Sequence, residues 1–299
     1  MICRKLLLGK FYLNIPDAAK RLFDLDTPQT VFIAAISSDI GMQLAHYYSD
    51  AGYHIIGTYR DASHINPAFR DAQNIHLLRC DLTVDQDIVQ VVEYMQRKGL
   101  VWDRFVSAVG LLSPIGKFVD VPAAEWKKSV TLNSLQQLEL LHHLYAVKRP
   151  DCTGNVAFLV GGAINRAFAN YSAYSLGKVM LVKFCELISD ETADLHCVAI
   201  GTGWVASKIH LQTLAAGDKA GENLAATQQF VEKGEQGTSV KDIYDLMEWC
   251  FARPETRGRN FSVVHDQWRG GGGELSAQLA ESPDMFRLRR HGNQHKKSS

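Results

Sequence analysis

The sequence lacks the features that mark several large classes of protein. It has no run of the ~20 apolar residues that a membrane-spanning helix requires, and its 32 basic and 32 acidic side chains leave a formal net charge of zero. This balance gives no support for a nucleic-acid partner or an acidic membrane surface. Its six cysteines are scattered without a C-x-x-C pair, which argues against a zinc site. We therefore expect a cytoplasmic protein with reduced thiols, no bound metal, and neither nucleic acid nor membrane as its partner.

Segments with the pattern of strands and of helices alternate along most of the chain. Short apolar runs predict strands, at residues 31–35, 53–59, 75–81, 104–110, 155–160, 195–200 and 260–265. Amphipathic stretches between them predict helices, at residues 42–50, 67–72, 84–98, 126–129, 132–147, 172–189 and 240–252. Residues 204–236 are polar and alanine-rich, and predict one or two further short helices. Such alternation predicts an α/β fold, a doubly wound parallel sheet in three layers, α/β/α.

The chain shows no internal repeat and no linker, which indicates one main domain at residues 29–268. Residues 1–28 fit no strong pattern, and we expect an N-terminal extension with a short helix near residues 17–23. Residues 269–299 begin with a run of glycines and continue with basic side chains. We expect this stretch to form a mobile C-terminal tail rather than a nucleic-acid-binding arm.

Tyr174 and Lys178 form the pattern that carries the most chemistry. If the segment is helical, the two side chains lie on one face and can meet the same ligand. A nearby ammonium favours the phenolate and should lower the pKa of the tyrosine. Carbonyl reduction needs an acid of this kind, which protonates the oxygen as a hydride arrives. The same spacing also occurs on ordinary solvated helix faces, so the rest of the chain has to support the interpretation.

The loop after the first predicted strand is the candidate phosphate site. In a strand–turn–helix unit, backbone amides and the helix N-terminus can receive a pyrophosphate. The candidate residues are Ala35, Ser37, Ser38, Ile40 and Gly41. Glycine is wanted where the backbone takes a positive φ or approaches the phosphate closely. Ala35 occupies one such position and Asp39 another, so the loop is poor as a bare motif.

The ordered set of motifs resembles the short-chain dehydrogenase/reductase superfamily, of the single-domain type, over about residues 30–265. The Thr-Gly-x-x-x-Gly-Ile-Gly loop of that family corresponds to residues 34–41. Asp81, with its neighbour Leu82, falls at the acidic position that faces the adenine in the family, although it could also cap the following helix. The family's Asn-Asn-Ala-Gly motif corresponds to residues 107–110, where only its glycine is retained, as Gly110.

The second half of the chain continues the resemblance. Asn133 matches the family's mid-helix asparagine, which holds a water on the path to the lysine. Tyr174 and Lys178 match the catalytic pair. Residues 202–207 match the Pro-Gly-x-Val-x-Thr segment, so the resemblance implies that Gly203 and Val205 contact the cofactor.

The resemblance implies a Rossmann fold and an NAD(P)-dependent oxidoreductase that interconverts a small-molecule carbonyl and an alcohol. In this scheme Tyr174 protonates the substrate oxygen, Lys178 adjusts the tyrosine and bonds the nicotinamide ribose, and Asn133 orders a relay water. The resemblance also implies a homodimer or homotetramer, formed through the helices at 132–147 and 172–189. The apolar content of these helices equally fits simple burial on the sheet.

One departure from the family concerns the chemistry directly. The family's catalytic serine falls on Gly161 in this chain. Loss of such a hydrogen-bond donor typically costs ~10²–10³ in rate. Asn165 or Ser172 could replace it, the enzyme could be slow, or the chain could keep the fold and the cofactor without turnover. A non-catalytic NADP-binding sensor or scaffold is therefore the main alternative, and a nucleotide-sugar epimerase or dehydratase is a third, for which the chain has little room.

The end of the second predicted strand indicates the preferred cofactor. NAD sites usually place an acidic residue there to accept hydrogen bonds from the ribose. This chain has Tyr59 followed by Arg60, and an arginine can pair with the 2′-phosphate of NADP. We therefore favour NADP over NAD, with an ordinary surface charge as the alternative interpretation of Arg60.

Overall fold

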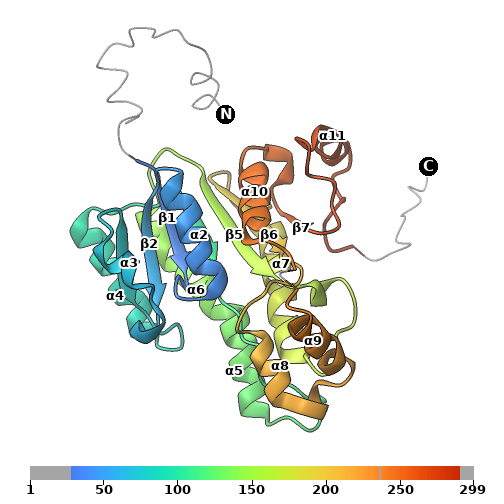
Figure 1. The fold of residues 1–299 in the computed structure, drawn as a ribbon. Helices are drawn as coiled ribbons and strands as arrows, with labels where there is room; N and C mark the ends of the chain where they lie inside the picture. Colours follow the sequence, from blue (N-terminus) through green and yellow to red (C-terminus); the bar gives the residue numbers. More distant parts are fainter. Residues whose placement is uncertain (1–27, 236, 290–299) are drawn as a thin grey trace, which may run out of the picture.

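The structure, a computed structural model, describes residues 28–235 and 237–289 and is built around a seven-stranded sheet (Figure 1). The strands are β1 (Thr30–Ala34), β2 (His54–Tyr59), β3 (Ile75–Arg79), β4 (Arg104–Ser107), β5 (Gly154–Val160), β6 (Leu195–Gly201) and β7 (Arg259–Ser262). All pairs are parallel, and the order across the sheet is β3-β2-β1-β4-β5-β6-β7. The predicted fold class is confirmed.

The strand order reverses next to β1, and this fixes where a ligand can bind. Val31 pairs with Ile55 of β2 on one side and with Arg104 of β4 on the other. The connections that leave β1 and β4 therefore run to opposite sides and open a crevice at the carboxyl ends of these strands. Residues that follow β1, β4, β5 and β6 converge at this edge of the sheet.

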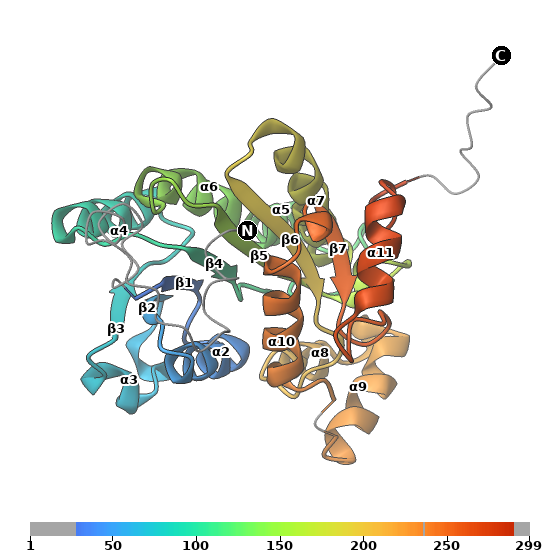
Figure 2. The ribbon, with the colours of Figure 1, turned by 90° about the horizontal axis from the view of Figure 1, so that it is seen from above.

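Helices cover both faces of the sheet, as Figure 2 shows for α2 and α10 on one side and α4 and α6 on the other. The first face carries α2 (Asp39–Asp50), α3 (Pro67–Asp71), α10 (Val240–Phe251) and α11 (Gly273–Glu281). The second face carries α4 (Asp85–Lys98), α5 (Ala123–Asn133), α6 (Leu135–Leu144) and α7 (Ser172–Glu191). Side chains alternate along a strand, so in β1 Val31 and Ile33 belong to the first apolar core while Phe32 belongs to the second.

Two further helices lie beyond the carboxyl ends of the strands (Figure 1). These two, α8 (His210–Ala216) and α9 (Glu222–Glu232), follow β6. Single 3₁₀ turns are η1 (Ala62–His64), η2 (Tyr145–Val147), η3 (Gly162–Ile164), η4 (Gly217–Ala220) and η5 (Pro254–Thr256). We refer to residues 204–235, which contain α8 and α9, as the lid. No helix in the described part of the chain is both long and apolar enough to cross a membrane.

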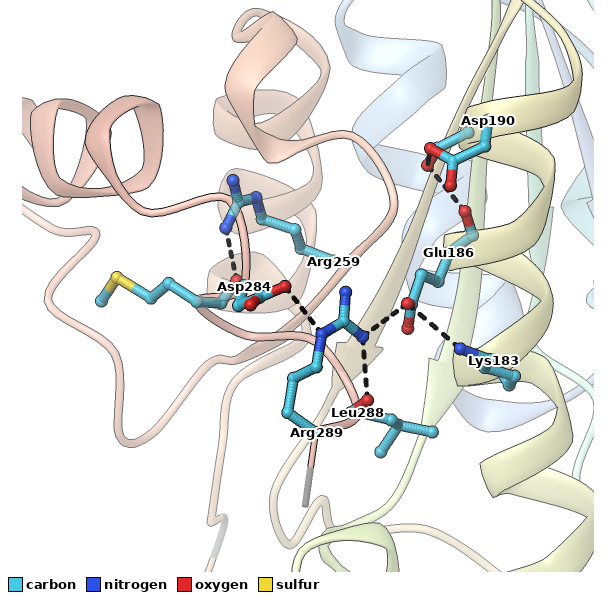
Figure 3. Close-up of polar contacts among 9 residues, drawn as sticks. Lys183, Glu186, Asp190, Arg259, Asp284, Leu288 and Arg289 are labelled. Carbon is cyan, nitrogen blue, oxygen red and sulfur yellow. Dashed lines mark hydrogen bonds and ion pairs between the residues drawn. The ribbon is translucent and has the colours of Figure 1, made fainter. Parts of the chain in front are cut away.

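The C-terminal segment differs from the expected tail. Leu275 and Leu279 of α11 are buried in the core of the first face, so the expectation of a mobile tail is wrong for residues 269–289. Arg289 donates to Glu186 of α7 at 2.6 Å and to Asp284 at 2.7 Å, which holds the segment against the domain (Figure 3). The glycine run suggested flexibility, but three of its residues take positive φ values in a turn that leads into α11. The expected N-terminal helix near residues 17–23 and the last residues of the chain lie outside the described residues.

Candidate active site

A cavity of about 1300 Å³ opens at the carboxyl ends of the central strands. Its walls come from the loops after β1, β4, β5 and β6, from α7 and from the lid. Many of the residues predicted from the sequence line it, namely Ser37, Ser38, Ile40, Gly110, Tyr174, Lys178, Gly203 and Val205. The other predicted residues are not in its lining, namely Ala35, Gly41, Arg60, Asp81, Leu82 and Asn133.

Helix α7 brings Tyr174 and Lys178 together in the cavity wall. Both lie in its first half, four residues apart, and both are buried, with 9% and 2% of their surface exposed. The Nζ atom of Lys178 lies 5.9 Å from the centre of the Tyr174 ring. It donates to the carbonyl oxygens of Val109 at 2.7 Å and Leu159 at 2.9 Å. These two bonds join α7 to the ends of β4 and β5.

Burial controls the protonation of this pair. It raises the pKa of the Tyr174 phenol to about 12 and lowers the pKa of the Lys178 amine to about 7. The sequence-based expectation that the ammonium lowers the tyrosine pKa is therefore wrong for this structure. An amine with this pKa is only half charged at pH 7, and its N–H groups point to backbone carbonyls. Tyr174 is consequently a protonated phenol at neutral pH.

The phenol of Tyr174 occupies space at the position of the missing serine. Gly161 follows β5, and a Cβ atom added to it would lie 2.6 Å from the Tyr174 hydroxyl oxygen. Of the two proposed substitutes, Asn165 lines the cavity, whereas Ser172 does not and its hydroxyl accepts a hydrogen bond from Trp126 at 2.9 Å. Ser172 is therefore not a substitute donor in this structure, and Asn165 remains the candidate.

Asn133 acts on the backbone beside the cavity. It is fully buried at the junction of α5 and α6, and its amide accepts from the backbone N–H of Leu111 at 3.0 Å and donates to the carbonyl of the same residue at 2.7 Å. A third bond joins it to the Ser129 carbonyl at 2.9 Å. A Cβ at Gly177 would come 2.6 Å from the Cβ of Asn133, so α5 and α7 can pack this closely only because residue 177 is glycine. Asn133 thus fixes the segment after β4 relative to the helix that carries Tyr174.

The candidate phosphate loop has two glycines fewer than the family pattern, since Ala35 and Asp39 stand where the family has glycine. Ala35 adopts a left-handed conformation with a φ of 62°, which is where a family glycine would stand. Gly41 lies so close to this turn that an added Cβ would be 2.3 Å from the Ala35 carbonyl oxygen. Ser38 caps α2 by accepting from the Gly41 N–H at 3.0 Å. The N-terminus of α2 therefore opens onto the cavity, as a phosphate site requires.

Asp39 connects this loop to the lid. Its Oδ2 atom accepts from the backbone N–H of Lys208 at 2.6 Å, and its Oδ1 atom lies 3.9 Å from the Lys208 ammonium. Both residues line the cavity. The sequence showed only that Asp39 replaces a glycine; its contact across 169 residues of chain could not be predicted from the local pattern.

Asp81, expected near the adenine, and Arg60, expected at the 2′-phosphate, are both absent from the cavity lining. Asp81 accepts from the backbone and side chain of Thr83, at 2.9 and 2.8 Å, so it forms a turn ahead of α4. Burial acts to raise its pKa, but these hydrogen bonds and the nearby charge of Arg60 hold the pKa below its usual value. Arg60 is exposed at the end of β2. His64 of η1 does reach the cavity lining, a position that no sequence signal marked.

The lid supplies contacts that sequence reasoning missed. The side-chain oxygen of Gln212 accepts from the backbone N–H groups of Leu112 and Ser113, both at 3.0 Å. The rings of Trp204 and His210 stack with their centroids 5.2 Å apart. These residues lie in the stretch expected to form a variable substrate lid, so only contacts in the folded chain could identify them.

No group of three or more histidine, cysteine or acidic side chains that could hold a metal ion occurs in the described part of the chain. The arrangement instead combines a buried phenol and amine with an open helix N-terminus at the switch point of a parallel sheet. A phenol beside an amine at this edge of the sheet is placed where a bound substrate could exchange a proton with it.

Comparison with known proteins shows the family of this chain. A family model described as enoyl-(acyl carrier protein) reductase matches residues 34–242. An uncharacterized oxidoreductase of Saccharomyces cerevisiae is 24% identical over 228 residues, which cover 76% of this chain and 77% of the relative. The chain belongs to the short-chain dehydrogenase/reductase family of oxidoreductases.

Solved structures show the same fold. A short-chain dehydrogenase/reductase from Saccharomyces cerevisiae superposes with a TM-score of 0.72 at 18% identity, covering 87% of this chain and all of that one. A short-chain dehydrogenase from Shigella flexneri, complexed with NADP, superposes with a TM-score of 0.65 at 16% identity, covering 79% of this chain and 96% of that one.

Proposed function

We propose that the protein is an NADP(H)-dependent oxidoreductase that reduces a ketone or aldehyde, or oxidises the corresponding alcohol. The observation that carries this proposal is the Tyr174–Lys178 pair in the wall of a cavity that also reaches the N-terminus of α2. One cavity thus contains both the proposed proton donor and the proposed phosphate site.

The residues present fit a nicotinamide dinucleotide in most respects. The left-handed turn at Ala35 and the close approach at Gly41 expose the first turn of α2, and Ser37 and Ser38 line the cavity beside it. Gly110 and Gly203 also line this cavity. When bound, the dinucleotide would supply or accept the hydride.

Tyr174 is the proposed acid and base. Because its pKa is raised to about 12, the phenol holds its proton at neutral pH and can donate it to a carbonyl oxygen of the substrate. Oxidation of an alcohol requires the phenolate, which is scarce at pH 7. We therefore propose that the protein catalyses reduction at neutral pH, and that oxidation becomes efficient only under alkaline conditions.

Lys178 and Asn133 have positioning roles in this proposal. The lysine is held between the carbonyls of Val109 and Leu159, beside the tyrosine, where it can bond the ribose of the cofactor. Asn133 fixes the backbone at Leu111. Its further role in ordering a relay water rests on the family resemblance. Asn165 is the proposed partner of the substrate oxygen in place of the missing serine.

The preference for NADP rests on Arg60. Its guanidinium is exposed at the end of β2, where an arginine can meet a 2′-phosphate. The Shigella flexneri neighbour is described as complexed with NADP. NAD remains the less favoured cofactor.

We also propose that the chain forms a homodimer or homotetramer. Leu176, Met180 and Leu187 form an exposed apolar stripe along one side of α7, because their spacing places them within one face of the helix. A stripe of this kind is suited to packing against a second copy of α7. We also propose a cytoplasmic location, because Cys185, Cys197 and Cys250 are buried free thiols.

A non-catalytic NADP sensor is the second candidate function. Three observations favour it: a glycine in place of the serine, a tyrosine whose pKa burial raises, and a carboxylate at the phosphate loop. The retained pair on α7 favours the enzyme, since a sensor needs only the nucleotide site.

The test is a dehydrogenase screen with both cofactors over a panel of carbonyls and alcohols, together with a titration of NADPH fluorescence. We expect turnover of at least one carbonyl, and a loss of about 10²–10⁴ in kcat for Tyr174→Phe. Tyr145→Phe, which removes an exposed phenol outside the cavity lining, is the matched control and should retain full activity. NADPH binding without turnover of any substrate would favour the sensor, and unchanged turnover in Tyr174→Phe would refute the proposed acid.

A further inference from the structure

Asp39 is the least expected residue of the candidate phosphate site. It is the first residue of α2, where the family loop has a glycine. Its side chain is only 23% exposed and makes its contacts with the lid, at 2.6 Å to the backbone N–H of Lys208 and 3.9 Å to the Lys208 ammonium. A glycine at this position could make none of these contacts.

A carboxylate at this position uses the same positive helix end that a phosphate would use. The N-terminus of a helix carries a partial positive charge and unpaired N–H groups, and it stabilises either an acidic side chain or a bound anion. Asp39 adds a negative charge directly beside the Ser38 cap. A pyrophosphate that approached the first turn of α2 would meet this charge at short range, where like charges repel by an amount that depends strongly on the local dielectric.

The contact also determines the position of the lid. Lys208 lies between β6 and α8, and four residues later Gln212 accepts from the backbone of Leu112 and Ser113. The start of the lid is therefore fastened at two points, one on α2 and one on the segment after β4. Asp39 provides the first of these points, on the side of the cavity where the phosphates are expected.

We propose that Asp39 is an acidic latch: its carboxylate holds the lid to the N-terminus of α2 and occupies the side of the phosphate site, so that a dinucleotide binds only at the expense of this contact. The inference rests on the proposed function for the identity of the anion. It implies that the chain binds nicotinamide dinucleotides more weakly than the same fold would with glycine at position 39. It also implies that the phosphate loop and the lid are coupled.

Two substitutions separate the charge from the contact. Asp39→Asn removes the negative charge but retains an oxygen that can accept from the Lys208 N–H. Asp39→Gly removes both. Asp242→Asn is the matched control, because Asp242 is another acid in the cavity lining and is paired at 3.3 Å with Arg269, which lies outside the lid.

The first measurement is the dissociation constant of NADPH, obtained by fluorescence titration at low and at high salt. We expect Asp39→Asn and Asp39→Gly to bind at least about fivefold more tightly than the wild type at low salt. The gain should shrink at high salt, because salt screens the repulsion. Asp242→Asn should stay within about twofold of the wild type.

The second measurement is limited trypsin digestion without nucleotide, since Lys208, Lys219 and Lys233 are cleavage sites within the lid. Asp39→Gly should be cut at these sites at least about threefold faster than the wild type, because the lid loses a point of attachment. Asp39→Asn should fall between the two. Equal melting temperatures of the variants would show that the faster cleavage is local.

The outcomes distinguish the latch from the proposed function. If the wild type binds NADPH and Asp39→Gly binds no more tightly, the repulsion is refuted. If the lid of Asp39→Gly is cut no faster than that of the wild type, the latch is refuted. If neither the wild type nor Asp39→Gly binds NADPH or NADH near millimolar concentration, the proposed cofactor and the proposed repulsion are both refuted. The digestion still decides whether Asp39 holds the lid.

Discussion

Restoring the serine of the family at position 161 should impair this protein. A Cβ atom at this position would lie 2.6 Å from the hydroxyl oxygen of Tyr174. Ordinary contact distances are about 3.5 Å, so the tyrosine, the loop or both must move by roughly 0.9 Å. The next residue offers a control, since a Cβ at Gly162 would meet no atom within 4 Å.

Two effects of opposite sign decide the outcome. Overpacking of a well-packed site costs about 1–3 kcal/mol, and a 1 Å displacement of a catalytic group can cost about 10²-fold in rate. A restored serine hydroxyl could in turn contribute ~10²–10³ if it reached the substrate oxygen. Gly161→Ala introduces the steric effect alone, so comparison with Gly161→Ser isolates the contribution of the hydroxyl. Because Tyr174 is displaced in both variants, we expect the steric effect to dominate and both to lose about tenfold to 10²-fold in kcat.

The assay is steady-state reduction of the best carbonyl from the substrate screen, with NADPH affinity and melting temperature measured in parallel. Gly162→Ala should retain activity within about twofold, because its methyl group enters open space. NADPH affinity should be unchanged in all three variants if the clash acts only on Tyr174. A rise in kcat for Gly161→Ser with no change for Gly161→Ala would refute this reasoning. It would show that the chain lacks a donor and that the tyrosine adjusts freely.

The same site makes three further outcomes testable. Alcohol oxidation should accelerate steadily between pH 7 and 10, whereas carbonyl reduction should change little. The reason is that the pKa of Tyr174 is about 12 and only oxidation needs the phenolate. Initial rates in both directions test this prediction, and a pH-independent oxidation rate would contradict it. Lys178→Met should abolish turnover yet raise the melting temperature at pH 7, with a gain that shrinks towards pH 10. The reason is that the pKa of Lys178 is about 7 in the folded state, below its ordinary value of 10.5. Between these two pH values the unfolded chain binds more protons, so wild-type stability rises with pH. Thermal unfolding from pH 6 to 10 measures the gain of Lys178→Met, and a gain that grew with pH would be inconsistent with a buried amine. Met180→Glu combined with Leu187→Glu should convert an oligomer to monomers in size-exclusion chromatography with light scattering, and an unchanged mass would exclude this face of α7 as the interface.

The sequence predicts the fold well because the sheet is buried on both faces. Each strand appears as a short apolar run, and each is separated from the next by an amphipathic stretch. The boundary between α5 and α6 was expected at residues 130–131, whereas the helix breaks at Ser134, beside Asn133. The C-terminal segment was wrongly expected to be mobile because its glycine run has a local signature of flexibility. Its order depends instead on contacts far away in the chain, such as the burial of Leu275 and Leu279.

The candidate site was predictable only in part, for a related reason. Residue types at fixed spacing, such as Tyr174 and Lys178, identify the chemistry from the sequence alone. The pKa of the tyrosine was not predictable, because its direction depends on how deeply the phenol is buried and on which groups the amine contacts. The partner of Asp39 could not be predicted either, because Lys208 is distant in sequence and donates from its backbone N–H.

The three departures from the family pattern have different structural consequences. Ala35 replaces a glycine but adopts the left-handed conformation of that glycine, at a strain cost of about 1 kcal/mol, so the turn itself is preserved. Gly161 replaces a serine, and the phenol of Tyr174 lies in the space that this serine would need. Asp39 replaces a glycine with a charge that the rest of the loop does not neutralise; its partners come from the lid. The first two changes are compatible with the proposed binding of a dinucleotide and a carbonyl substrate. The third makes cofactor affinity depend on the state of the lid, so an NADPH titration of the wild type and Asp39→Gly is the experiment that separates an inherited cofactor site from one that the chain has modified.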